Sequence, residues 1–90
     1  MDGGAQLDAL IALAESLEIT VRCIAGRPGD GASAADLVRL NGKSVLFLDS
    51  TAPPAEQATA VAKALAGRPE LQDRFLPPAL REAIDRAGGR

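Results

Sequence analysis

Few side chains of this 90-residue chain could carry chemistry. The chain contains no histidine, a single cysteine and a single methionine. Without histidine, Ser-His-Asp and Cys-His catalytic arrangements are excluded, and one cysteine cannot supply the ligands of a typical zinc site. The sequence therefore predicts no catalytic residues, no metal and no cofactor.

The cysteine, Cys23, would be the obvious nucleophile. It falls in the middle of an alternating apolar segment, on the same side as Ile19 and Val21. A reactive thiol needs exposure and nearby positive charge, and Arg22 is the cation adjacent in sequence. The alternation favours a small buried core residue instead.

Carboxylates are more numerous than other reactive groups. Asp49 and Glu56 flank the start of a predicted helix, where acids cap the first turn or favour the helix dipole. We interpret both as structural. Because two carboxylates of an active site can come from distant positions, an enzyme built on carboxylates and Cys23 is kept as a third hypothesis.

The segment Gly26–Ser33 has the spacing of a phosphate-binding loop. It follows a predicted strand, carries the pattern G-x-x-x-x-G from Gly26 to Gly31, and ends in serine. However, Ala32 stands where such a loop has its lysine, and Asp30 would repel a phosphate. We interpret the segment as a linker between strands, and keep a small-ligand or phosphate-binding protein using this loop as the alternative function.

Charge and hydropathy limit the partners and the location. The net charge is −2, and no Tyr or Trp accompanies the basic cluster, so nucleic-acid binding is not expected. That cluster consists of Arg22, Arg27, Arg39 and Lys43. No apolar run is long enough for a membrane span, and the acidic start Met1-Asp2-Gly3-Gly4 is unlike a secretory signal. Together with the single cysteine, these features predict a cytoplasmic location.

Hydrophobic periodicity predicts three helices, over residues 5–18, 54–66 and 79–86. Alternating β-branched residues predict a strand over 19–25, and Gly67 is the expected terminator of the second helix. The residues expected to face the core are Leu7, Leu10, Ile11, Ala14 and Leu17 in the first helix, Ala58, Val61, Ala62 and Leu65 in the second, and Leu80, Ala83 and Ile84 in the third.

Residues 35–49 are predicted to form a β-hairpin. Asn41-Gly42 favours a two-residue turn because both central residues of that turn need positive φ. The alternative is a short helix that begins at Ser33 and has Asp36 in its first turn. We prefer the hairpin because Asn41-Gly42 is followed at once by the strongest strand pattern in the chain, Val45-Leu46-Phe47-Leu48. The turn pairs Leu40 with Lys43, Val38 with Val45, and Leu37 with Leu46.

Both faces of this hairpin are apolar. One face carries Ala35, Leu37, Leu46 and Leu48, and the other carries Val38, Leu40, Val45 and Phe47. The order of elements is α-β-β-β-α-α, which predicts one α+β domain over residues 1–90 with a three-stranded antiparallel sheet packed by helices.

The stretch from the third strand to Gly67 resembles the strand-then-helix segment of the ImmA/IrrE family of zinc metallopeptidases. The resemblance rests on Val45-Leu46-Phe47-Leu48-Asp49, Glu56-Gln57 and the helix Val61–Gly67, about a third of the chain. Members of that family carry H-E-x-x-H on this helix to hold zinc and activate water. The two histidine positions fall at Lys63 and Gly67 here and the glutamate at Ala64, so the resemblance implies a fold without catalysis.

The chain is also similar to small uncharacterised bacterial proteins that share its glycine-rich loop, its LFLD strand and its LPPALRE tail. We therefore expect a non-catalytic cytoplasmic protein-interaction module that binds a protein partner or itself. Helices of a chain this short can cover one face of the hairpin, so the face with Val38, Leu40, Val45 and Phe47 needs the last helix or another subunit. The specific prediction is a homodimer through that face or its edge.

Overall fold

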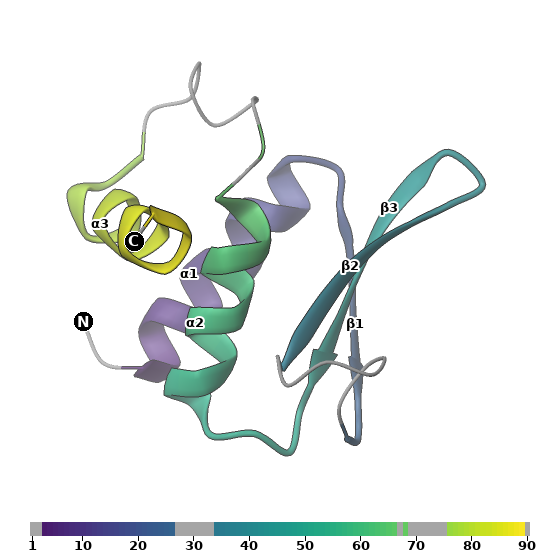
Figure 1. Ribbon diagram of the computed structural model, residues 1–90, viewed down its shortest axis with the longest axis horizontal. Coiled ribbons are helices and arrows are strands. Elements are labelled where there is room, and N and C mark those ends of the chain that lie inside the picture. Colours follow the sequence, from purple (N-terminus) through teal and green to yellow (C-terminus); the bar gives the residue numbers. More distant parts are fainter. Residues whose placement is uncertain (1–2, 27–33, 67, 69–75, 90) are drawn as a thin grey trace.

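The computed structural model describes residues 3–26, 34–66, 68 and 76–89, and these form a single small domain of class α+β (Figure 1). Its elements are α1 (Gly3–Ser16), β1 (Thr20–Ile24), β2 (Ala35–Leu40), β3 (Lys43–Asp49), α2 (Pro54–Leu65) and α3 (Pro78–Gly89). The α+β class is therefore confirmed. The first helix begins and ends two residues before its predicted bounds, and the third extends beyond its predicted end.

The sheet is mixed, and the prediction of an antiparallel sheet is wrong. The strand order is β1-β3-β2, with β1 parallel to β3 and β2 antiparallel to β3. Strand β1 pairs in parallel with β3 and is not a neighbour of β2.

The central place of β3 follows from its composition. A central strand is shielded on both edges, which suits the apolar run Val45–Leu48, whereas β2 carries Asp36 and Arg39 and tolerates an edge. Residues 25–34 separate β1 from β2, a connection longer than the two to five or so residues of a hairpin loop. A connection of this length does not require β1 and β2 to be neighbours in the sheet.

The hairpin register is as predicted from its turn. Leu40 pairs with Lys43, Val38 with Val45, and Leu37 with Leu46. The two central residues both have positive φ, 52° at Asn41 and 79° at Gly42. The alternative of a short helix in this region is wrong, since residues 35–40 form β2.

Helix α1 turns into β1 through a tight left-handed corner. Glu18 has a φ of 65°, its N–H donates to the Glu15 carbonyl at 3.0 Å, and the Ile19 N–H donates to the Ala14 carbonyl at 3.1 Å. These two bonds are those of a Schellman motif, which usually has glycine where Glu18 stands. Ile19 and Ala14 are both buried, and the corner therefore places Ile19 under the helix.

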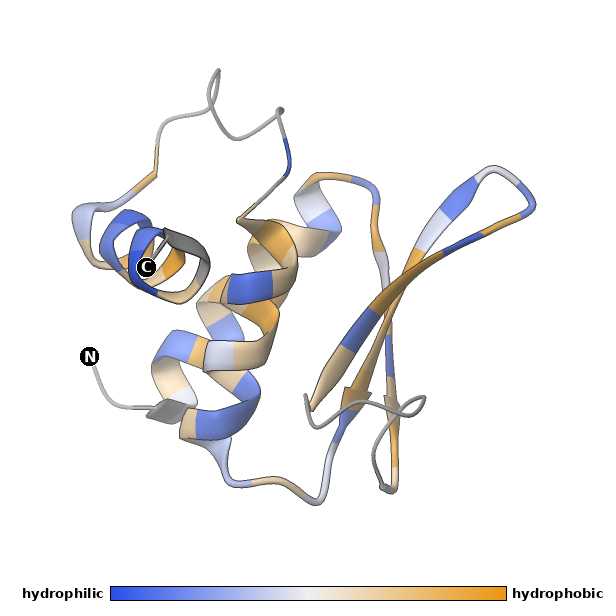
Figure 2. Cartoon of the chain, in the orientation of Figure 1, coloured by the Kyte–Doolittle hydropathy of each residue, from blue (hydrophilic) through white to orange (hydrophobic). Residues whose placement is uncertain are grey.

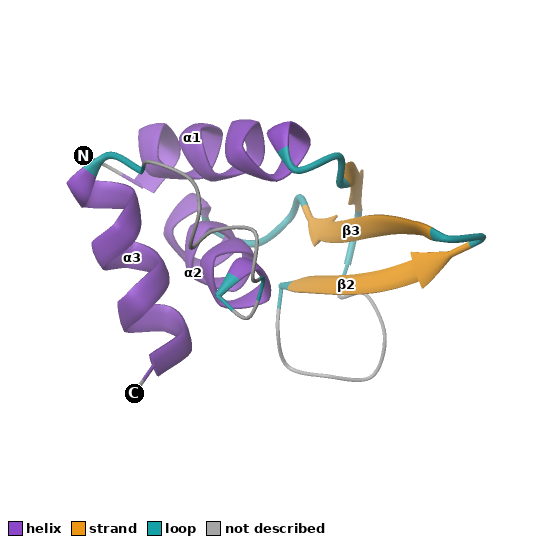
Figure 3. Cartoon of the chain, turned by 90° about the horizontal axis from the view of Figure 1, so that it is seen from above, coloured by secondary structure: helices purple, strands orange, loops and turns teal. Residues whose placement is uncertain are grey.

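The molecule has three layers (Figures 1 and 3). Helices α1 and α2 pack side by side on one face of the sheet, with α1 against β1 and α2 against β2 and β3. Helix α3 packs on α2 and α1 and, among the described elements, does not contact the sheet. No helix in the described part of the chain is long and apolar enough to span a membrane.

The core lies between the helix pair and the sheet. The predicted inward residues of α2 and α3 are buried, and in α1 Leu10 and Ala14 are buried while the other three are half-buried. Apolar residues run along most of β2 and β3, while polar residues mark the outer sides of the helices (Figure 2). The apolar strand residues that join this core are Ile19 before β1, Val21, Ala35, Leu37, Leu46 and Leu48.

Candidate functional site

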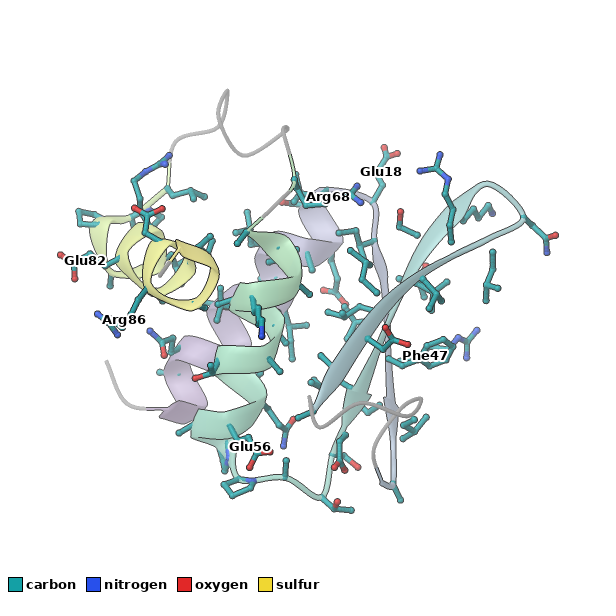
Figure 4. All side chains as sticks on the ribbon, viewed as in Figure 1. Glu18, Phe47, Glu56, Arg68, Glu82 and Arg86 are labelled. Carbon is teal, nitrogen blue, oxygen red and sulfur yellow. The ribbon has the colours of Figure 1, made fainter. Side chains whose placement is uncertain are left out.

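The second face of the sheet, turned away from α1 and α2, is the candidate site. The hairpin register places Val38, Leu40, Val45 and Phe47 on it. Val45 is buried, with 8% of its surface exposed, yet it is not part of the core beneath the helices. Leu40 is 50% exposed, and Phe47 projects to the side opposite the helices (Figure 4).

Strand β1 adds three residues to this face that the sequence alone did not connect with it. The parallel register sets Thr20 beside Val45, Arg22 beside Phe47, and Ile24 beside Asp49. We call the set Val38, Leu40, Val45, Phe47, Thr20, Arg22 and Ile24, together with Asp36 and Lys43, the open face. Period-two alternation in residues 19–25 would have found the β1 members, but only the pairing of β1 with β3 brings them to this place.

One row of the open face carries charge at both ends. Phe47 in the centre pairs with Asp36 on β2 and with Arg22 on β1. Both charged residues are exposed. The open face therefore has an apolar centre between a carboxylate on one edge strand and a guanidinium on the other.

Cys23 is exposed, and the prediction that it is a buried core residue is wrong. Its register partner is Leu48, on the helix-covered face as the alternation indicated. Because β1 is an edge strand, Cys23 has a strand neighbour on one side only. Alternation alone gives the face of a residue but not whether a helix reaches it.

Asp49 lies at the carboxyl end of β3 and is only 3% exposed. Its Oδ1 accepts hydrogen bonds from the Gly26 N–H at 3.0 Å, from the Thr51 N–H at 2.9 Å and from the Thr51 hydroxyl. The predicted role as a helix cap is wrong, since residue 53 is the N-cap of α2 and no side chain caps it. The carboxylate instead ties the end of β1 to the turn that leads into α2.

The predicted ligand loop Gly26–Ser33 lies outside the described residues except for Gly26. That glycine has a φ of 101°, and an added Cβ would meet nothing within 4 Å. Its N–H donates a hydrogen bond to the Asp49 carboxylate, so this donor is directed at the protein itself and not at a bound anion. Ligand binding by this loop stays a prediction.

The helix that resembles a zinc-binding helix is α2. At the positions where the metallopeptidase family has its ligands and its glutamate, Lys63 is exposed and Ala64 is half-buried, and Gly67 lies outside the described residues. The described residues contain no group of three or more His, Cys, Asp or Glu side chains that could hold a metal ion. No protein-family model, no curated protein and no solved structure matches this chain, so the resemblance stays a prediction.

Proposed function

We propose that this protein is a non-catalytic interaction module that forms a homodimer through its open face. The observation that carries the proposal is that face itself: an apolar centre with the half-buried Phe47 and Val38, which no described helix covers. The exposed Leu40 extends it towards the hairpin turn. Apolar surface of this kind is stabilised by burial against another molecule.

The charges at the edges of the open face support a second copy as the partner. When two identical sheets stack face to face around a two-fold axis parallel to β3, β1 of one copy lies opposite β2 of the other. Asp36 of each copy then faces Arg22 of the other, and the two Phe47 rings meet near the axis. The face is complementary to itself in this orientation.

The other in-plane two-fold axis, perpendicular to the strands, is disfavoured. It would set Asp36 against Asp36 and Arg22 against Arg22, and like charges across an interface oppose association. The charge row thus selects one of the two stacked arrangements. Because a three-stranded face is small, we expect a reversible dimer with a dissociation constant of about micromolar size.

Sedimentation velocity on charge-reversed variants tests this proposal. Asp36→Arg and Arg22→Asp each place like charges opposite one another, and we expect each to weaken the dimer about tenfold or more. The double variant restores opposite charges with the signs exchanged, and its dimer should return to near the original affinity. Both positions are exposed, so the variants should fold, which circular dichroism checks.

Glu82→Arg and Arg86→Asp are the matched controls. Both residues are exposed on α3, on the far side of the helices from the sheet (Figure 4), and they repeat the same two charge changes. These controls should leave the association unchanged. A protein that stays monomeric up to about millimolar concentration overturns the proposal. If the affinity of the dimer is unchanged in all four single variants, the open face is excluded as the interface, and pairing through a sheet edge is favoured instead.

A further inference from the structure

A second surface lies at the opposite end of the sheet from Asp49, and it shares only Thr20 and Lys43 with the open face. A cleft of about 480 Å³ opens between the hairpin end, the α1–β1 corner and Arg68, which lies beyond the end of α2. Three cations from separate segments line it: Arg39 on β2, Lys43 on β3 and Arg68 beyond α2. Glu18 lines the same cleft, and Figure 4 shows it and Arg68 near each other at this end of the molecule.

Only part of the basic cluster that the sequence suggests lies in the cleft. Arg39 and Lys43 line the cleft, with Lys43 at the border of the open face, while Arg22 lies beside Phe47 and does not line the cleft. Arg68, which belongs to neither a helix nor a strand, joins them. Ser44, the cross-strand partner of Arg39, adds a hydroxyl, as does Thr20 at the start of β1.

We propose that this cleft binds a small phosphorylated metabolite through its phosphate group. Guanidinium groups donate in pairs to phosphate oxygens, an ammonium group adds a compact charge, and hydroxyls complete the donor set. Three cations against one carboxylate form a local positive field on a chain whose net charge is −2. The volume falls within the range of about 300 to 1,000 Å³ for small-molecule sites, and it leaves room for more than the phosphate.

Glu18 provides a test that distinguishes this cleft from a general basic surface. Glu18 lines the cleft from a left-handed backbone position that the Schellman bonds hold in place. A carboxylate beside a bound phosphate opposes binding. Glu18→Gln should therefore tighten phosphate binding by about threefold, whereas loss of a cation should weaken it.

The test is an NMR titration of amide shifts with inorganic phosphate and with ribose 5-phosphate, at ionic strength held constant with sodium chloride. We expect saturable shifts within residues 17–20, 39–44 and 68. Arg39→Gln and Lys43→Gln, both at exposed positions, should each weaken binding about tenfold. Ribose 5-phosphate should bind more tightly than phosphate, because it fills more of the cleft.

Lys63→Gln is the control, since Lys63 is exposed on α2 outside the cleft and the change in net charge is the same. It should leave the affinity unchanged. Affinities that fall equally in all three lysine and arginine variants overturn the proposal in favour of general charge screening. Shifts confined to residues 26–33 overturn it in favour of the glycine loop, and phosphate that binds as tightly as ribose 5-phosphate overturns the assignment to a metabolite.

Discussion

The two faces of the sheet have nearly the same apolar composition but opposite surroundings. On β3, Leu46 and Leu48 point under the helices and are 0% exposed, while their neighbour Phe47 points away from them. Leu40, beyond Val38 on the open face, is half exposed. Apolar residues on a strand therefore do not by themselves define a core. The helices decide which face forms the main core of the monomer, and the other face is the one that we propose for association.

The largest expected change in stability comes from a substitution on the helix-covered face. Leu46→Ala should lower the free energy of unfolding by about 3 kcal/mol, because it removes buried methyl groups and leaves a cavity in a core with few aromatic residues. Chemical denaturation followed by circular dichroism measures the change. Low protein concentration keeps any dimer from contributing to the apparent stability.

Leu40→Ala is the same chemical change on the open face and serves as the matched control. With half of its side chain already in water, Leu40 should contribute less than about 1 kcal/mol to the monomer. Equal losses in the two variants would contradict the difference between the faces. They would mean that the open face is as fully packed in the monomer as the helix-covered one.

Asp49 is a charged residue that is buried on the side of the sheet away from α1 and α2, and it tests what holds that position. It follows Leu48 in the strand, so its side chain belongs to the side of the open face, yet hydrogen bonds rather than apolar packing hold it. Asp49→Ala should cost about 2 kcal/mol, since the N–H groups of Gly26 and Thr51 lose their acceptor. Asp49→Asn keeps one carbonyl oxygen and should cost about half as much.

Thermal unfolding of the two Asp49 variants separates the effect of the negative charge from that of the hydrogen-bond acceptor. If Asn were as destabilising as Ala, the negative charge rather than the acceptor geometry would hold this corner. If neither variant changed the midpoint, the tie between β1 and the turn before α2 would not stabilise the fold. Hydrogen exchange at Thr51 should rise in the Ala variant in either destabilising case.

Local signals in the sequence were sufficient to predict the elements whose contacts lie between residues close together in the chain. Asn41-Gly42 predicts the hairpin and its register because a two-residue turn leaves no choice of pairing. The inward residues of α2 follow from helical spacing alone. These features depend on neighbours in the chain, so sequence reasoning reaches them.

The features that depend on distant segments could not be predicted. Whether β1 pairs with β2 or β3 depends on which strand the rest of the fold leaves in the centre of the sheet. The residues 19–25 alone do not indicate which strand that is. The pairing of β1 with β3 is what brings Arg22 into the row of Asp36 and Phe47. The cleft draws residues from the α1–β1 corner, the hairpin and the end of α2, and no spacing in the sequence links the three.

The smallest expected change in stability concerns Glu18, whose corner decides which residues of β1 face the helices. Its left-handed corner places Ile19 under α1, and because strand residues alternate, Thr20 and Arg22 then belong to the open face. Glu18→Gly removes the steric cost of that φ but adds chain entropy to the unfolded state, so we expect a gain of about 0.5 kcal/mol. Glu18→Val, with a β-branched side chain at the same φ, should lose about 1 kcal/mol or more. Denaturation midpoints that rise for glycine and fall for valine would show that this corner is left-handed in solution. The opposite order would mean that β1 leaves α1 along another path, and that the assignment of Arg22 to the open face has to be abandoned.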